Sequence, residues 1–192
     1  VADKASVHEN LKKAGYPVTK LGQKKPNDRL LRAVNLVSEA VVRDEWIFVF
    51  SNGHGLLQAL AKIVPVVYSL TTMLSCMNVT NEKIMNALAA KRPSDDFSDD
   101  PAGESLHLMR TAGCLVWEDV VEPVAGSSKQ AGRILEILKH RRFRCFPTVF
   151  TACYQGQFTE KTLELMLDRL GDNLGSTTRG IIREACRLQH FQ

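Results

Sequence analysis

Residues 45–61 read EWIFVFSNGHGLLQALA. The run from Trp46 to Phe50 is apolar and bulky, it breaks at a Ser-Asn-Gly-His-Gly turn, and apolar residues at helical spacing resume at Leu56. This order predicts a buried strand, a glycine-rich turn and a helix. Because backbone amides and the helix dipole point outward at a helix N-terminus, such a turn is an architecture that cradles phosphates.

The residues that would neutralise a bound nucleotide are nevertheless missing from this turn. The phosphate-binding motif reads G-x-x-x-x-G-K-[ST], and its lysine contacts the β- and γ-phosphates while its hydroxyl holds Mg²⁺. With Gly55 as the last glycine, Leu56 takes the lysine position and Leu57 the hydroxyl position, and Phe50 replaces the first glycine. The candidate nucleotide-binding residues are Gly53, His54, Gly55, Leu56 and Leu57.

The composition is that of one ordinary globular domain. The 192 residues are 44% hydrophobic and 24% charged, which is enough apolar material for a sizeable core. No apolar run approaches the roughly 18 residues of a membrane span, and the polar N-terminus does not resemble a secretory signal. Five scattered cysteines without a C-x-x-C pair indicate reduced thiols, so we expect a cytoplasmic protein.

The net charge of +4 is unevenly distributed along the chain. Residues 1–32 are basic, residues 94–122 are acidic, and the chain after 129 is basic again, most densely at 139–144. This asymmetry favours nucleic-acid contact through Arg141, Arg142 and Arg144. The alternative is a solvated helix end, where cations are favoured by the helix dipole. The aspartates of 94–101 lack the EF-hand spacing and indicate a solvated loop.

The rest of the chain alternates between strand and helix patterns. We expect a basic N-terminal arm at 1–26 and one domain at 27–192. Strands are predicted at 46–50, 66–70, 114–117 and 148–151, with an edge strand at 188–191. Helices are predicted at 28–43, 55–64 (ended by Pro65), 80–91, 131–139, 159–170 and 179–187. This alternation predicts an α/β fold with a parallel sheet covered on both faces.

Polar and small residues follow directly after three of these strands. The glycine turn follows the first strand, Glu118 and Asp119 follow the third, and Cys153 follows the fourth. The carboxyl ends of parallel strands lie at one edge of a sheet, where ligands bind. We therefore expect these residues to lie close together in the folded chain.

Four stretches, in order, resemble one known family. They are AGCLVWEDVVEP at 112–123, GRILEILKHRR at 132–142, FPTVFTAC at 146–153, and the closing region from Asp168 to Ile182. They are similar to the Walker B strand, the basic-ended helix, the sensor strand and the closing box of AAA+ helicase loaders (DnaC and DnaI), which are related to the transposition ATPase IstB. The resemblance implies a three-layer P-loop NTPase (AAA+) core over residues 27–192. Its mainly parallel sheet of about five strands would be flanked by helices, without a separate lid domain.

The resemblance also implies roles for individual residues. In an active member, Glu118 and Asp119 would be the acids that activate water and hold Mg²⁺, with Asp119 as the metal ligand. Arg179 would be an arginine finger that reaches the nucleotide of a neighbouring subunit. Cys153 replaces the polar sensor that orients the attacking water.

The leucines at the lysine and hydroxyl positions argue against an active site. Charge-assisted hydrogen bonds contribute about 1.5–3 kcal/mol each, and 1.4 kcal/mol is about a factor of ten in affinity. We expect ATP binding at least about a hundredfold weaker than in an intact site, so no cofactor is the expected case and weakened binding of ATP or ADP with Mg²⁺ is the alternative. Because Leu56 and Leu57 suit the core side of a helix, we expect them to pack and partly close the pocket.

The central hypothesis is a degenerate AAA+ ATPase-like domain that acts through protein or DNA contacts in DNA replication. Its expected partners are a replicative helicase, another AAA+ subunit or DNA, and no membrane is expected. One alternative is an active ATP-dependent helicase loader or transposition ATPase. Another is a DNA-binding module that uses no nucleotide, in which Phe143 between the arginines stacks on bases.

Overall fold

Five parallel strands form the centre of the molecule, in a computed structural model that describes residues 28–89, 101–122 and 128–191. The predicted arm at 1–26 and the acidic residues 94–100 lie outside this described part. The strand order is β2-β3-β4-β1-β5, and every neighbouring pair is parallel. The strands are β1 (Trp46–Ser51), β2 (Cys76–Thr80), β3 (Cys114–Glu118), β4 (Thr148–Cys153) and β5 (Cys186–Phe191).

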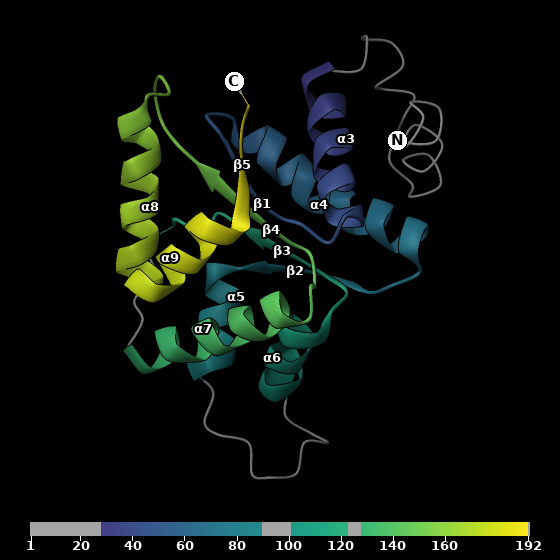
Figure 1. Ribbon diagram of the computed structural model, residues 1–192, viewed down its shortest axis with the longest axis vertical. Helices are drawn as coiled ribbons and strands as arrows, with labels where there is room; N and C mark the ends of the chain where they lie inside the picture. Colours follow the sequence, from purple (N-terminus) through teal and green to yellow (C-terminus); the bar gives the residue numbers. More distant parts are fainter. Residues whose placement is uncertain (1–27, 90–100, 123–127, 192) are drawn as a thin grey trace.

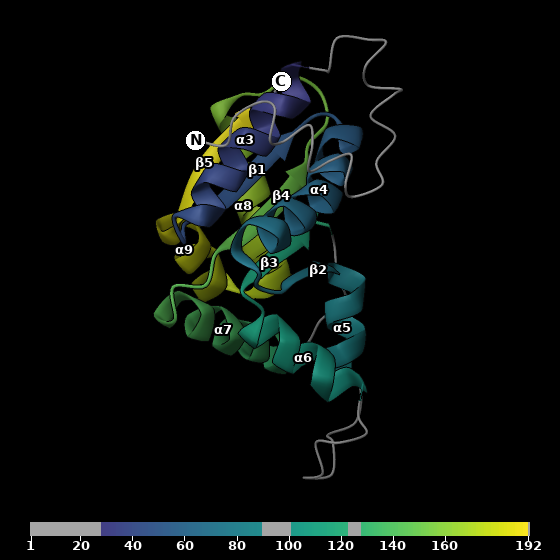
Figure 2. The same ribbon diagram turned by 90° about the vertical axis from the view of Figure 1, so that its right-hand side faces the viewer.

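Helices cover both faces of the sheet and make three layers (Figure 1). Helices α3 (Asp28–Val42) and α4 (His54–Thr72) lie on one face; Figure 2 shows them on the side away from α7. The opposite face is covered by α5 (Asn81–Ala89), α6 (Pro101–Thr111), α7 (Ser128–Phe143), α8 (Glu160–Leu174) and α9 (Ser176–Ala185). The predicted three-layer α/β fold with about five strands is therefore confirmed.

Strand β1 shows how the sequence builds two cores. All six of its residues are buried, and successive side chains point to opposite faces. Phe48 and Phe50 join the core under α5–α9, whereas Ile47 and Val49 join the core under α3 and α4. A strand buried on both faces has to be apolar throughout, which is why this run was recognisable in the sequence.

The predicted strand at 66–70 is wrong. Helix α4 continues through Pro65 to Thr72, and Val67 and Tyr68 pack in the core as part of its buried face. The second strand of the sheet is β2 instead, and four of its five residues are only half-buried. By length and composition α4 could also cross a membrane, but here it is a core helix of the α/β sandwich.

A side chain from β2 compensates for the proline in α4. Pro65 has no amide hydrogen, so the carbonyl of Ala61, one turn earlier, loses its normal helical donor. The Asn78 Nδ2 donates to this carbonyl at 3.2 Å. The helix therefore passes through the proline without leaving that carbonyl unsatisfied, and the sequence rule that a proline ends a helix fails here.

The remaining element predictions are confirmed with shifted ends, and one helix was missed. Strands β3 and β4 and helices α5, α7 and α8 lie where the patterns indicated, and α9 starts at Ser176 rather than Arg179. Residues 186 and 187 belong to β5 instead of the last helix. Helix α6 was not predicted, because its few apolar residues give no strong helical face.

Candidate functional site: a closed phosphate turn beside two acids

The predicted convergence at the carboxyl edge of the sheet is confirmed. A pocket of about 180 Å³ lies between the start of α4 and the ends of β2, β3 and β4. Its lining includes His54 and Leu57 from α4 together with Glu118 and Asp119 from the end of β3. Cys153 adjoins it, because its backbone amide donates to Asp119 Oδ1 at 3.2 Å. Residues far apart in sequence thus share one small polar pocket.

The glycine turn itself is short. Strand β1 continues to Ser51 and α4 begins at His54, so Asn52 and Gly53 alone separate strand from helix. The Gly53 carbonyl already accepts from the amide of Leu56, and the Gly53 amide donates to Ser51 Oγ at 3.1 Å. A phosphate-cradling loop needs several consecutive backbone amides that face the ligand. Here most positions of the motif are instead part of regular secondary structure.

The two leucines pack as expected. Leu56 is 9% exposed and Leu57 is 5% exposed, and both belong to the core between the sheet and the helices α3 and α4. Leu57 also lines the pocket beside the acids. An apolar side chain therefore forms part of the pocket wall next to Glu118 and Asp119.

Both acids are held by other parts of the chain. Asn78 Nδ2 donates to Glu118 Oε1 at 2.6 Å, in addition to its bond with α4. Asp119 has a φ of 44°, a left-handed conformation that Asp tolerates better than most residues. Its amide donates to Thr151 Oγ1 at 3.0 Å, which fixes the β3–β4 junction. Each carboxylate thus has one oxygen in a hydrogen bond within the chain.

Cys153 is not a substitute for a polar sensor. Burial, followed by the nearby Asp119 carboxylate, raises the pKa of its thiol, so the thiol stays protonated at neutral pH. Its Sγ lies 3.8 Å from the Tyr154 carbonyl oxygen, a weak contact. A neutral thiol positions a water molecule poorly, because it is a weak donor and a weak acceptor.

Arg29 was not found by sequence reasoning. From α3 its guanidinium donates to Ser51 Oγ at 2.7 Å and to the Phe191 carbonyl at 3.0 Å. A Cβ built on Gly53 would lie 3.9 Å from one of its nitrogens. Arg29 therefore ties the turn to α3 and β5. No motif signalled this role, because a single arginine in a basic region carries no pattern.

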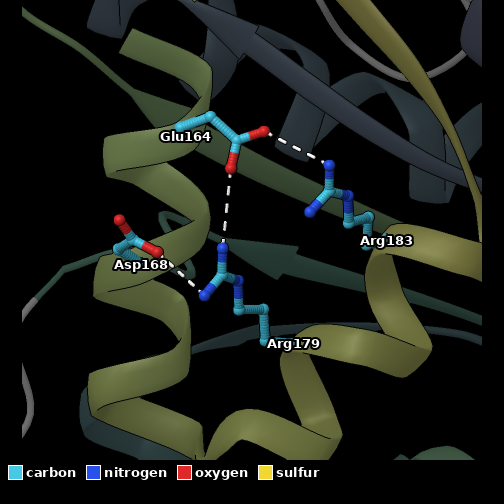
Figure 3. Close-up of polar contacts among 4 residues, drawn as sticks. All are labelled: Glu164, Asp168, Arg179 and Arg183. Carbon is cyan, nitrogen blue, oxygen red and sulfur yellow. Dashed lines mark hydrogen bonds and ion pairs between the residues drawn. The ribbon is translucent and has the colours of Figure 1, made fainter. Parts of the chain in front are cut away.

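Arg179 lies on the surface between α8 and α9 and is paired within its own chain (Figure 3). Its guanidinium contacts Asp168 Oδ1 at 2.8 Å and Glu164 Oε2 at 3.5 Å, and its side chain is 30% exposed. Arg183 shares Glu164 at 3.3 Å. A finger that acts on a neighbouring subunit would first have to leave these two carboxylates.

The predicted nucleic-acid patch is wrong at one of its three arginines. Arg141 is fully buried at 0% exposure, and its guanidinium hydrogen-bonds to Thr148 Oγ1 and to three backbone carbonyls. Arg142 and Arg144 are exposed, and Phe143 between them is 84% exposed. The exposed part of the predicted patch therefore consists of Arg142, Phe143 and Arg144. Within the described ranges, no group of three or more metal-ligating side chains gathers.

Comparison with solved structures shows the fold. The DnaC helicase loader matches with a TM-score of 0.62 and 20% identity, covering 84% of this chain and 89% of that chain. DnaI matches with a TM-score of 0.59 and 17% identity, covering 86% of each chain. This chain has a DnaC/DnaI-like AAA+ fold. AMPPCP-bound DnaA from Aquifex aeolicus matches this AAA+ fold at a TM-score of 0.60 and 9% identity, over 82% of this chain and 45% of that chain.

The structural neighbours of this AAA+ fold are therefore DNA-replication helicase loaders and initiators. Neither a protein-family model nor a curated protein sequence matches the chain. At identities this low the likeness concerns the fold, and the roles of individual residues have to be argued from the site itself.

Proposed function

We propose that this chain is a degenerate AAA+ ATPase-like module that works in DNA replication through protein or DNA contacts rather than through ATP turnover. The observation that carries the proposal is the buried pair Leu56 and Leu57 behind a two-residue turn. The pocket keeps its acids but offers no described cation at the lysine position and no hydroxyl at the Mg²⁺ position. An ATP polyanion would meet a leucine and the three acidic residues Glu118, Asp119 and Glu122 there, which is electrostatically unfavourable.

Calorimetric titration of the full chain with ATP and Mg²⁺, repeated with ADP, tests the proposal. We expect no saturable heat at millimolar nucleotide. Micromolar binding would overturn the degenerate assignment, as would ATP turnover that disappears in Glu118→Gln. The retained acids are the observation that favours this active alternative, and the same variant shows whether they serve catalysis.

The surface formed by Arg142, Phe143 and Arg144 supports DNA as one partner. An aromatic ring exposed by 84% between two exposed arginines suits base stacking combined with phosphate contact. In fluorescence anisotropy with a single-stranded oligonucleotide, Phe143→Ala should weaken binding by about tenfold, since stacking contributes about 1–3 kcal/mol per base. Arg43→Ala, at an exposed arginine in the turn directly after α3, is the control. Binding that is equal in all variants and independent of salt would exclude this surface.

The structural similarity to DnaC is the basis for proposing a protein partner. DnaC is described as a helicase loader, and the present chain covers most of its length. We propose a replicative helicase or a further AAA+ subunit as the protein partner. Co-sedimentation with purified helicase, with and without nucleotide, tests it, and nucleotide-independent association is the expected result.

A further inference from the structure

A second chemical cluster lies at the amino edge of the sheet, opposite the pocket. Cys76 and Cys114 are the first residues of β2 and β3, and Tyr68 and Arg141 approach them from α4 and α7. The AAA+ site at the carboxyl edge uses none of these four residues. Two thiols beside a buried cation form a chemically distinct site.

The register of the sheet places the two cysteines directly opposite each other. Cys76 pairs with Cys114 in the parallel β2–β3 ladder. Neighbouring strands lie about 4.8 Å apart, which falls within the 4.4–6.8 Å range of Cα separations in disulfides. Both side chains belong to the same face of the sheet.

Arg141 places a positive charge next to this pair. Its hydrogen-bond acceptors among the described residues are all neutral: the Thr148 hydroxyl and the carbonyls of Met109, Ala112 and Pro147. Burial lowers its pKa to about 10, so it remains charged at neutral pH. The ionisable groups whose charge would raise the pKa of Arg141 are Cys114, Cys76 and Tyr68. A buried cation without a carboxylate stabilises a thiolate that forms nearby.

The two sulfurs differ in their access to solvent. Cys76 is half-buried on the edge strand β2, whereas Cys114 is fully buried. The hydrogen bond with Cys76, followed by burial, raises the pKa of Cys114 well above its usual range. Cys114 therefore keeps its proton at neutral pH. Because Cys76 is the more accessible of the two thiols, it is the sulfur that reacts first with a reagent from solvent.

We propose that Cys76 and Cys114 form a thiol–disulfide exchange site for low-molecular-weight disulfides such as glutathione disulfide. The Cys76 thiolate attacks one sulfur of the reagent and expels one glutathione thiolate, which takes up a proton. Cys114 then loses its proton and attacks the Cys76 sulfur, and the second glutathione leaves as thiol. The two cysteines are oxidised to one disulfide while one glutathione disulfide is reduced to two thiols.

Mass spectrometry of the full chain tests this without any variant. Trypsin places Cys76 in peptide 63–83, Cys114 in peptide 111–129 and Cys186 in peptide 184–187. After graded exposure to glutathione disulfide, acid quenching and alkylation, we expect peptides 63–83 and 111–129 to become linked. Dithiothreitol should return both as separate thiol peptides. Peptide 184–187 should stay alkylated, because Cys186 is buried without a second thiol opposite it in the ladders.

Two variants identify the order of the steps. In Cys114→Ser the resolving sulfur is absent, so a Cys76–glutathione mixed disulfide should accumulate several-fold over the native chain. Cys145→Ser removes an exposed thiol outside the cluster and should leave the linked peptides unchanged. The proposal is overturned if Cys76 and Cys114 remain alkylated at reagent concentrations that modify Cys145. It is equally overturned if the mixed disulfide at Cys76 is as persistent in the native chain as in Cys114→Ser.

Discussion

At the residue scale, Asn78 links two features: the carbonyl that Pro65 leaves without a helical donor, and the Glu118 carboxylate of the pocket. Its Nδ2 donates both to the Ala61 carbonyl and to Glu118, while its Oδ1 is buried without a described partner. One amide therefore fixes the helix that follows the turn and the carboxylate that faces it. Removing that amide should affect the stability of the fold and the position of the acid together.

Asn78→Leu should lower the free energy of unfolding by about 1–3 kcal/mol, because a carbonyl and a carboxylate lose their donor. Urea unfolding measures this. In a Pro65→Ala background the restored helical amide can bond the Ala61 carbonyl, so the same substitution should cost less. Additive effects in this double-mutant cycle would contradict the described link.

Arg141→Leu should destabilise the chain by more than about 3 kcal/mol, since four acceptors in the interior lose their donor at once. Arg142→Leu, at the next and exposed position, should change stability by less than about 0.5 kcal/mol. Urea midpoints of the two variants provide the comparison. Equal midpoints would mean that Arg141 is not a structural anchor.

At the element scale, a helix cap holds the start of α8, and side-chain contacts hold β5 in place. Thr159 and Thr162 form a reciprocal cap at the start of α8. In β5, His190 lies against the Phe158 ring, with centroids 4.0 Å apart, and its Nε2 is 2.6 Å from the Tyr154 hydroxyl. These contacts hold the edge strand to the loop after β4.

Thr159→Ala should lower stability by about 1 kcal/mol, because the cap that bonds the Thr162 amide is lost. Lys161→Ala in the same turn is exposed and should be close to neutral. Thermal melts of both variants measure the difference. A loss at Lys161 equal to that at Thr159 would contradict the role of the cap.

The free energy of unfolding should also decrease as the pH is lowered, because of His190. Burial, followed by the Arg29 guanidinium, lowers the pKa of His190 below its ordinary 6.5. As pH falls through 6.5, the unfolded chain binds the proton first, so the free energy of unfolding decreases until the folded pKa is passed. In His190→Phe, which keeps the ring stacking, the loss between pH 7.5 and 5.5 should be smaller. An unchanged slope in urea titrations would contradict this.

At the scale of the whole molecule, our proposal is that this fold works without ATP turnover. The pocket contains Leu57, and Arg179 is engaged with Asp168 and Glu164. In sedimentation velocity we expect the same distribution of species with and without ATP and Mg²⁺. ATP-dependent assembly that is lost in Arg179→Ala would show that the finger is used across a subunit boundary.

Sequence reasoning reached the parts of this molecule that are governed by local pattern. The strands β1, β3 and β4 are nearly continuous apolar runs, because burial on both faces demands it. The edge strand β2 was not predicted because four of its five residues, including Asn78, are only half-buried and form no such run. The convergence of the acids with the glycine turn followed from the rule for parallel sheets.

Long-range contacts explain what the sequence could not show. A basic run such as 139–144 is typical of a surface, yet Arg141 is buried and bonds to carbonyls from two separate segments, the end of α6 and the residue before β4. The bond of Arg29 to Ser51 likewise depends on how α3 lies across the sheet. Neither partnership leaves a periodic signal in the chain.

The strand order also has a consequence for how the chain folds during synthesis. Trp46 of β1 lies opposite Cys186 of β5, so β1 gains this neighbour only after nearly all of the intervening chain has left the ribosome. Contacts between residues so distant in sequence form slowly, because a long loop must close first. Until then β1 has one open edge, whose unpaired amides and carbonyls can pair with another chain. A nascent chain of this protein should therefore be most prone to aggregation just before β5 emerges.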